Sequence, residues 1–200
     1  MPDDVEARFL RLLDDRAFDQ VATLALETYG AELHGFLIHA LGSQSEAGDV
    51  FAQVVETFWR GLPRFAARCS MRTWLYLLAR HAEVNHRRSP WNGERRTGDA
   101  TLDALVHRVR SETPPWQRTD VKDRWREVRE ALAPEDRMLL VLRVDRELEW
   151  ADIARVTLGD PEPERAALAK ETVRLRKRFQ LLKQHLRARA RAAGLIGDAR

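Results

Sequence analysis

A cluster of aromatic and basic side chains lies in the segment between residues 64 and 88. This aromatic–arginine cluster consists of Phe65, Trp74 and Tyr76 together with Arg64, Arg68, Arg72 and Arg80. Aromatic rings stack on unpaired bases while guanidinium groups bind phosphates, so the combination predicts contact with single-stranded nucleic acid. The neighbours of Trp74 are apolar, and a position in a hydrophobic core is the competing interpretation of that ring.

Three polar residues, Asn85, Arg87 and Arg88, end the same segment. Asparagine can hydrogen-bond the edge of a base, and arginine is the preferred donor to phosphates and to the major groove. The two arginines would also oppose the dipole at a helix C-terminus, and the two roles are compatible.

A second basic segment lies between residues 165 and 191, where ten Lys or Arg residues accompany a single acid, Glu171. Its candidate contacts to nucleic acid are Arg174, Arg176, Lys177, Arg178 and Lys183. With so few acids available for pairing along a helix, an ordinary solvated face is the weaker interpretation. Two basic segments in an otherwise acidic chain predict two separate contacts with a polyanion.

Asp49 and Gln53 are four residues apart in a helical pattern, so their side chains share one face. A face of this kind is a candidate contact to a protein partner. The alternative is an ordinary exposed polar surface.

Metal and enzyme sites have little support in the sequence. His81, Glu83 and His86 lack the spacing of the zinc-binding motif, because histidines five residues apart lie on nearly opposite sides of a helix. The chain also has no glycine-rich phosphate loop and no closely spaced cysteine pair. We therefore expect no enzymatic activity, no cofactor and no metal.

Composition places the chain among folded proteins, with 44% hydrophobic and 32% charged residues in a length of 200. The single cysteine, Cys69, excludes an internal disulfide and suits a reducing compartment. Apolar runs are short, and the first residues lack the apolar core of a signal peptide. We expect a cytoplasmic protein that is not inserted in a membrane.

Apolar residues recur at three- and four-residue steps, and no segment alternates with a period of two. The pattern predicts a helix over 24–41 and a second helix with an N-cap at Ser45 that stops near Gly61. A third helix is expected from about Ser70 to Arg88. The predicted fold class is all-α.

Residues 89–120 are mostly polar, contain several Pro and Gly, and predict a linker with one helical fragment around Leu102–Val109. Helical periodicity returns with Trp125, and a helix start is expected at Pro134. A short helix that ends at Leu158-Gly159 is typical of the first helix of a helix-turn-helix. The long basic helix would face the core with Leu175, Phe179, Leu182 and Leu186.

In order along the chain, these patterns resemble the extracytoplasmic-function (ECF) group of bacterial RNA polymerase sigma factors. Residues 46–55 are similar to the acidic-then-glutamine signature of region 2, and Arg64-Phe65 with residues 71–80 is similar to its Phe…Thr-Trp-Leu…Ala-Arg core. The likeness covers roughly residues 24–88 for region 2 and 128–195 for region 4.

The resemblance implies two small helical domains: region 2 in residues 1–90, a linker in 91–122, and region 4 with a helix-turn-helix in 123–200. It implies binding to core RNA polymerase and promoter-specific transcription initiation. Asp49 and Gln53 would contact the clamp helices of the largest subunit. Region 2 would recognise and melt the −10 element, holding an unstacked base in a pocket, and region 4 would bind the −35 element of promoter DNA. An anti-sigma factor is a further expected partner.

The chain departs from the family pattern in three places. Gly48 stands where an acid is usual, and His81 and Asn85 stand where Asn and Asp are frequent. The largest departure is about ten additional residues, within 160–170, between the two helices of the helix-turn-helix. They either lengthen the turn or extend the recognition helix toward its N-terminus, and this leaves open which residues reach bases.

A helix-turn-helix repressor or activator that binds duplex DNA without core polymerase is the alternative function. It accounts for residues 128–195 and leaves the aromatic–arginine cluster unexplained. A third possibility, a protein-interaction adaptor, predicts no specific binding to DNA.

Overall fold

The computed structural model describes residues 2–88, 104, 106–109, 128–129, 131–192 and 194. Over these residues the chain is all-α without a strand, which confirms the predicted fold class. No helix in the described ranges is long and apolar enough to cross a membrane.

The chain divides into two compact units. The first comprises residues 1–113 with 155–164, and the second comprises residues 114–154 with 165–200. Each unit has its own packing and is described separately.

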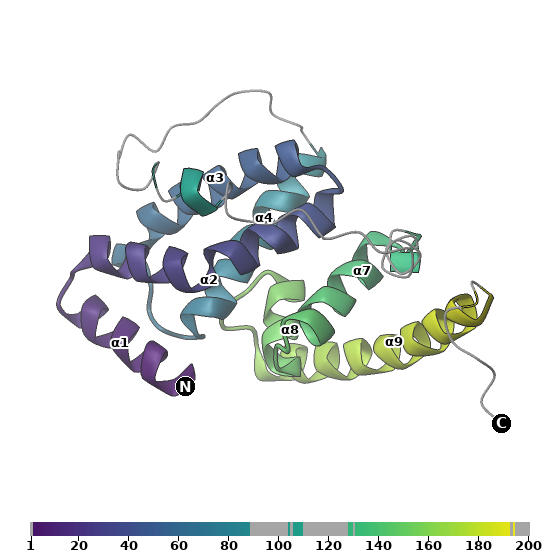
Figure 1. Cartoon of the computed structure of the whole chain (residues 1–200). Helices are drawn as coiled ribbons and strands as arrows, with labels where there is room; N and C mark the ends of the chain where they lie inside the picture. The colour runs from purple at the N-terminus through teal and green to yellow at the C-terminus, as the bar shows by residue number, and fades with distance from the viewer. Residues whose placement is uncertain are drawn as a thin grey trace. The chain divides into compact units, whose positions relative to one another are not determined.

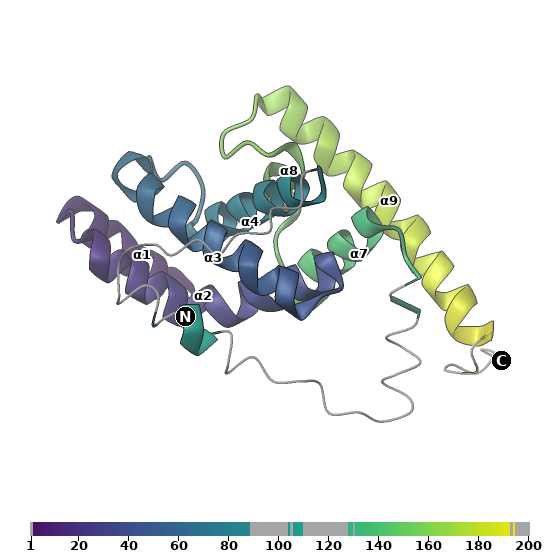
Figure 2. The same cartoon turned by 90° about the horizontal axis from the view of Figure 1, so that it is seen from above.

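The first unit is built on four helices, α1 (Pro2–Asp14), α2 (Phe18–Leu41), α3 (Gln44–Gly61) and α4 (Met71–Arg88). α2, α3 and α4 each pack against the other two, and α1 lies beside α2 (Figures 1 and 2). A 3₁₀ turn, η1 (Leu62–Arg64), follows α3 and leads into the loop before α4.

Aromatic rings fill the centre of this unit. Phe36, Phe51, Phe58 and Tyr76 are each at most 1% exposed. The rings of Phe36 and Tyr76 meet edge to face, with centroids 5.2 Å apart. Burial of such rings contributes roughly 2–3 kcal/mol each, so the core holds the ends of α3 and α4 in fixed positions.

The helix boundaries test the expectations from periodicity. α3 ends at Gly61 and α4 runs from Met71 to Arg88, as predicted within one residue. The predicted N-cap at Ser45 is wrong, because the Oγ of Ser43 accepts a hydrogen bond from the Glu46 N–H at 3.3 Å. Ser43 and Glu46 have the spacing of a capping box, whereas Ser45 lies inside the first turn.

The later part of the chain forms α7 (Pro134–Leu140), a π-helical segment η2 (Val141–Asp145), α8 (Trp150–Leu158) and α9 (Arg165–Ala192). The expected helix start at Pro134 is confirmed, with two acids in the first turn of α7. α8 ends before Gly159, whose φ of 72° is left-handed and suits glycine. α8 and α9 are the two helices that a helix-turn-helix requires, and their crossing in that motif stays a prediction.

The core of the second unit lies between α7 and α9, which pack side by side (Figure 2). Leu132, Leu140 and Leu182 are buried in it, with Phe179 and Leu186 packed against them. The predicted inward positions of α9 are therefore confirmed, and Leu175 is buried as well.

α9 buries no residue before Leu175, so its first ten residues precede the apolar ridge. The helix is continuous from Arg165, so residues 165–170 belong to α9 and not to the loop before it. Six residues, 159–164, remain between α8 and α9.

The expected linker lies mostly outside the described residues, as does Trp125. Of the fragment predicted around Leu102–Val109, residues 104 and 106–109 are described, and all five are helical.

Candidate nucleic-acid interface

Two rings of the aromatic–arginine cluster stack on each other at the end of α3. The centroids of Phe65 and Trp74 lie 4.5 Å apart with an interplanar angle of 23°. Trp74 also contacts Phe58, with the ring centroids 5.2 Å apart. On its other side the indole lies over Gly61, where an added Cβ would be 2.9 Å from Trp74 Cζ2. Trp74 is thus the inner ring, held by α3, and Phe65 is the outer ring.

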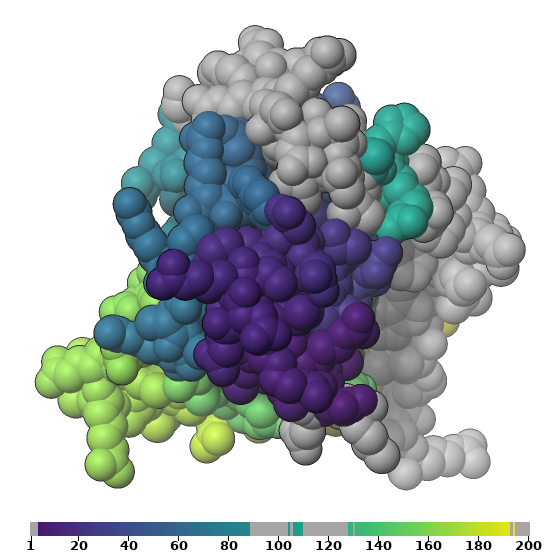
Figure 3. Space-filling model, turned by 90° about the vertical axis from the view of Figure 1, so that its left-hand side faces the viewer, coloured from purple at the N-terminus to yellow at the C-terminus, as the bar shows by residue number. Residues whose placement is uncertain are grey.

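A hollow of about 370 Å³ lies next to Phe65, between the end of α1, the start of α2 and the loop after α3. Its lining includes Leu10, Phe18 and Leu62 together with two non-glycine residues in the left-handed region, Arg16 at φ 54° and Ala67 at φ 51°. Such conformations are uncommon and often occur where a loop has a functional shape. Figure 3 shows this side of the first unit, with α1 in purple.

Two arginines of α4 are bound to a buried acid on the same helix. Glu83 is 1% exposed and forms ion pairs with Arg80, three residues before it, and with Arg87, four residues after it. Arg87 Nη2 also donates a hydrogen bond to the carbonyl oxygen of Ala40 at 2.7 Å. These arginines neutralise a buried charge and hold α4 against the end of α2.

Arg72 is engaged in the same way by α2. Its Nε donates to Glu32 Oε1 at 2.7 Å, and the hydroxyl of Tyr76 donates to the same oxygen at 2.8 Å. Burial acts to lower the pKa of Arg72, but the hydrogen bond and charge of Glu32 outweigh it and raise the pKa above its ordinary value. The ion pair between Arg72 and Glu32 therefore connects α4 to α2.

The other predicted contacts of this region face solvent. Arg64, Asn85 and Arg88 are exposed. On α3, Asp49 is exposed and Gln53 is half-buried, on one face of the helix as their spacing requires. Among the described residues, the predicted nucleic-acid contacts that remain accessible are therefore the half-buried Phe65 and the exposed Arg64, Asn85 and Arg88, rather than the whole predicted set.

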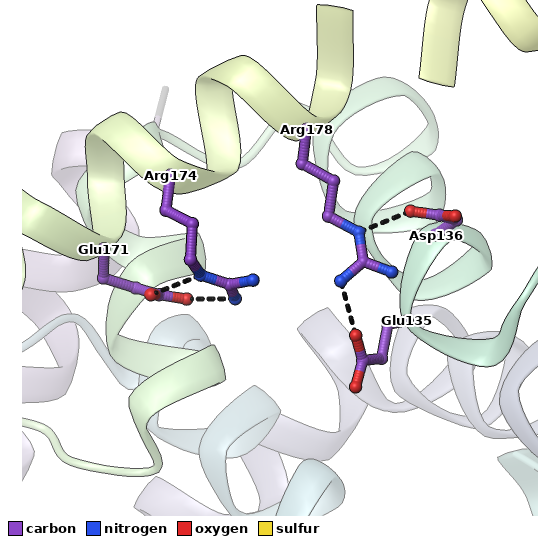
Figure 4. A network of polar contacts seen from close by, with 5 residues as sticks. All are labelled: Glu135, Asp136, Glu171, Arg174 and Arg178. Atoms are coloured by element: carbon purple, nitrogen blue, oxygen red, sulfur yellow. Dashed lines mark hydrogen bonds and ion pairs between the residues drawn. The ribbon is translucent and has the colours of Figure 1, made fainter. Parts of the chain in front are cut away.

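The basic helix α9 also contains arginines bound to acids (Figure 4). Both Nε and Nη2 of Arg174 donate to the Glu171 carboxylate, at 2.7 and 2.6 Å. Arg178 Nε donates to Asp136 at 2.6 Å, and its Nη1 forms an ion pair with Glu135, so that α9 is joined to α7. The hydrogen bonds that Arg174 and Arg178 donate to these acids raise the pKa of each guanidinium above its ordinary value.

Arg176 and Lys177 are exposed on α9. The Arg176 guanidinium lies 5.9 Å from the centroid of Trp150, a ring that Arg143 also approaches at 5.0 Å. Lys183 is half-buried, with its Nζ 5.6 Å from the Phe179 ring. Of the five predicted contacts on α9, Arg176 and Lys177 are the two that the helix presents to solvent without an acid bound to them among the described residues.

The sequence did not lead us to predict that these acids bind the arginines. Glu83 and Glu171 lie three or four residues from their arginines, a spacing that could have revealed them. Glu32, Glu135 and Asp136 come from other helices, and only tertiary structure brings them near.

The family model for Sigma-70 region 2 matches residues 25–92, which contain the ring stack and the face with Asp49. Residues 25–92 are therefore similar to a sigma-70 region 2. Within the matched residues, the predicted polymerase and −10 contacts lie mainly on α3 and α4, and Phe65 lies in the loop between these helices.

Two curated relatives add to the comparison. The chain is 32% identical over 103 residues to the "Probable RNA polymerase sigma-C factor" of Mycobacterium bovis and equally to the "ECF RNA polymerase sigma factor SigC" of Mycobacterium tuberculosis. The match covers 46% of this chain and 56% of each relative, so the chain spans about half the length of the relatives it matches. The resemblance to ECF sigma factors is confirmed over this stretch, and region 4 in residues 123–200 stays a prediction.

Proposed function

We propose that this protein is a sigma factor of the ECF type that binds core RNA polymerase and directs promoter-specific transcription initiation. The match of residues 25–92 to sigma-70 region 2 carries the proposal. The relatives are named as RNA polymerase sigma factors, which supports it. Sigma factors are regulators rather than enzymes. A repressor that acts without polymerase is not favoured, because it gives no role to a region 2.

The proposed division of the chain is region 2 in residues 1–90, a linker in 91–122 and region 4 in 123–200. Polymerase would bind α3, where Asp49 and Gln53 share one face and could contact the clamp helices of the largest subunit. The exposure of Asp49 supports this assignment. An anti-sigma factor would be a further partner, which competes with core polymerase for binding to this protein.

In region 2, Phe65 is the ring best placed to stack on an unpaired base of the −10 element. It is the outer member of the stack with Trp74 and lines the hollow beside α1, which could hold the unstacked base. Arg64, Asn85 and Arg88 are exposed and could bind phosphates or base edges. Arg72, Arg80 and Arg87 would then act mainly by keeping α4 in place.

In region 4, α9 would bind the −35 element as a recognition helix in the major groove. Its buried ridge faces the core, and Arg176 and Lys177 face solvent. Contacts to several phosphates would make binding strongly salt-dependent.

Run-off transcription from genomic DNA fragments tests the proposal. The full-length protein is added to several bacterial core polymerases, including that of its own source, and specific transcripts should appear only when both are present. A mobility-shift assay without core enzyme is the matched control, and tight specific binding there would favour the repressor instead. Absence of stimulated transcription with every core enzyme would contradict the proposal.

A further inference from the structure

Val173 is an apolar side chain at the surface of an otherwise basic helix. It is 51% exposed and lies two residues before the buried Leu175, which places it on nearly the opposite side of α9. Valine is a poor helix former at such a position, because its branched Cβ loses rotamer freedom. Neither core packing nor helix propensity therefore requires a valine here, and Val173 is available to contact a partner.

Cations stand on both sides of Val173. Lys170 lies one turn before it, and Arg176 and Lys177 lie one turn after it, all exposed. Among the described residues, neither lysine forms an ion pair with an acid. An apolar side chain between uncompensated cations fits a polyanion whose phosphates flank an apolar group.

The position of Val173 along α9 fits the part of a recognition helix that reads bases. Residues 165–174 precede the first buried residue of the helix and add about 15 Å to it. Residues in the N-terminal part of a recognition helix are the ones that reach base edges. Ala169, one turn before Val173, is exposed and too small to shield it.

Duplex DNA offers one apolar group in the major groove, the C5 methyl group of thymine. Two arginines in this part of the helix, Arg174 and Arg178, could have read guanine. However, Arg174 is bound to Glu171, and Arg178 is bound to Asp136 and Glu135. Arg176 remains exposed one turn after Val173 and is available for a phosphate, so Val173 is the apolar side chain that this face offers to a base.

We infer that Val173 packs on the methyl group of a thymine in the −35 element, with Lys170, Arg176 and Lys177 on the adjacent phosphates. The inference rests on the proposed function and specifies how α9 selects its site. It also gives a role to the additional residues of 160–170, which lengthen the helix on the side of Val173.

Deoxyuridine tests the contact, because it pairs like thymidine and lacks the methyl group. Holoenzyme reconstituted with its core polymerase first selects fragments from genomic DNA. Thymines in the upstream half of the bound site are then replaced one at a time by deoxyuridine. At one thymine the wild-type protein should bind about fourfold more weakly, the effect of one buried methyl group.

Val173→Ser should abolish that difference while the protein keeps its helicity by circular dichroism. Leu181→Ser is the matched control, because Leu181 is 66% exposed on the same helix and lies toward α7, and it should retain the sensitivity. An equal response of wild type and Val173→Ser to deoxyuridine, or no sensitive thymine in wild type, would overturn the inference alone. If the holoenzyme selects no DNA at all, both this inference and the proposed function are contradicted.

Discussion

α4 and α9 are both basic helices, and their positive charge has different uses. α4 buries seven of its 18 residues, including Glu83, and three of its four arginines, Arg72, Arg80 and Arg87, are bound to acids of α4 and α2. α9 buries three of 28 residues and presents Lys170, Arg176 and Lys177 to solvent. A run of arginines is therefore not in itself a binding surface, since the positions of nearby acids decide how much charge remains available.

This comparison separates two kinds of substitution. Where a cation neutralises a buried acid, its removal should lower the stability of the fold. Where a cation faces solvent, its removal should lower affinity for DNA and leave the fold unchanged.

The largest effect is expected at Glu83. Arg80→Ala combined with Arg87→Ala leaves a buried carboxylate without its cations and should lower the free energy of unfolding by about 3 kcal/mol. Urea denaturation of the full chain measures this. Arg64→Ala combined with Arg88→Ala removes the same charge from exposed positions and should leave the midpoint unchanged. Adding Glu83→Gln to the first pair should restore part of the loss, and equal midpoints for both pairs would refute the distinction.

The next effect concerns the outer ring of the stack. Phe65→Ala should reduce open-complex formation by roughly tenfold or more, as loss of base stacking predicts, and affect initial binding much less. Permanganate reactivity of unpaired thymines reports the open complex, and a mobility shift reports initial binding. A premelted promoter should restore part of the activity. Equal loss in both steps without rescue would show that Phe65 does not act on separated strands.

A smaller effect separates two neighbours on α9. Arg178→Ala should lower the free energy of unfolding by about 1 kcal/mol, because the ion pairs to α7 are partly exposed. Lys177→Ala should leave stability unchanged and reduce the slope of log affinity against log salt by about one. Urea denaturation and holoenzyme binding at several salt concentrations give the two quantities. If both variants changed the same quantity, the division between paired and open cations would not hold.

The smallest effect lies at the start of α4, where the Met71 N–H donates to Glu6 Oε1 at 2.9 Å. Burial raises the pKa of Glu6 above 4.5, and the hydrogen bond from Met71 offsets part of the rise. The folded state therefore holds this proton more tightly than the unfolded chain does, and the stability so gained is lost as pH rises through and above 4.5.

Glu6→Gln keeps an acceptor oxygen without the charge, so it should raise the free energy of unfolding slightly at pH 7, by less than about 0.5 kcal/mol in urea denaturation. The gain should disappear below pH 4.5, where Glu6 is itself protonated. A gain of equal size at both pH values would contradict the role of the buried charge.

Periodicity predicted α3, α4 and the inward side of α9 because each buries a regular set of apolar residues. The helix α1 was not predicted, although Val5, Phe9 and Leu13 follow at four-residue steps and Phe9 is fully buried. The short length of α1 and its many charges made the pattern weak. The cap at Ser43 was misplaced by two residues, although Glu46 gave the signal of a capping box.

The candidate site was predicted less well than the fold. Residue types located the aromatic–arginine cluster and the basic helix, but they did not show which arginines were already bound. Local spacing could have revealed Glu83 and Glu171. The partners Glu32, Glu135 and Asp136 depend on how helices pack, and no pattern along a single helix contains that information.

The contact between Gly61 and Trp74 limits how this surface can change in evolution. A Cβ at position 61 would lie 2.9 and 3.2 Å from two indole carbons of Trp74, and the ring could accommodate it only by moving Phe65 as well. A relative with a larger residue in place of Gly61 must have a smaller side chain in place of Trp74. Either substitution alone disrupts the stack. The two positions should therefore covary among relatives, and their joint identity would mark the same ring stack in sequences too distant to align by motif.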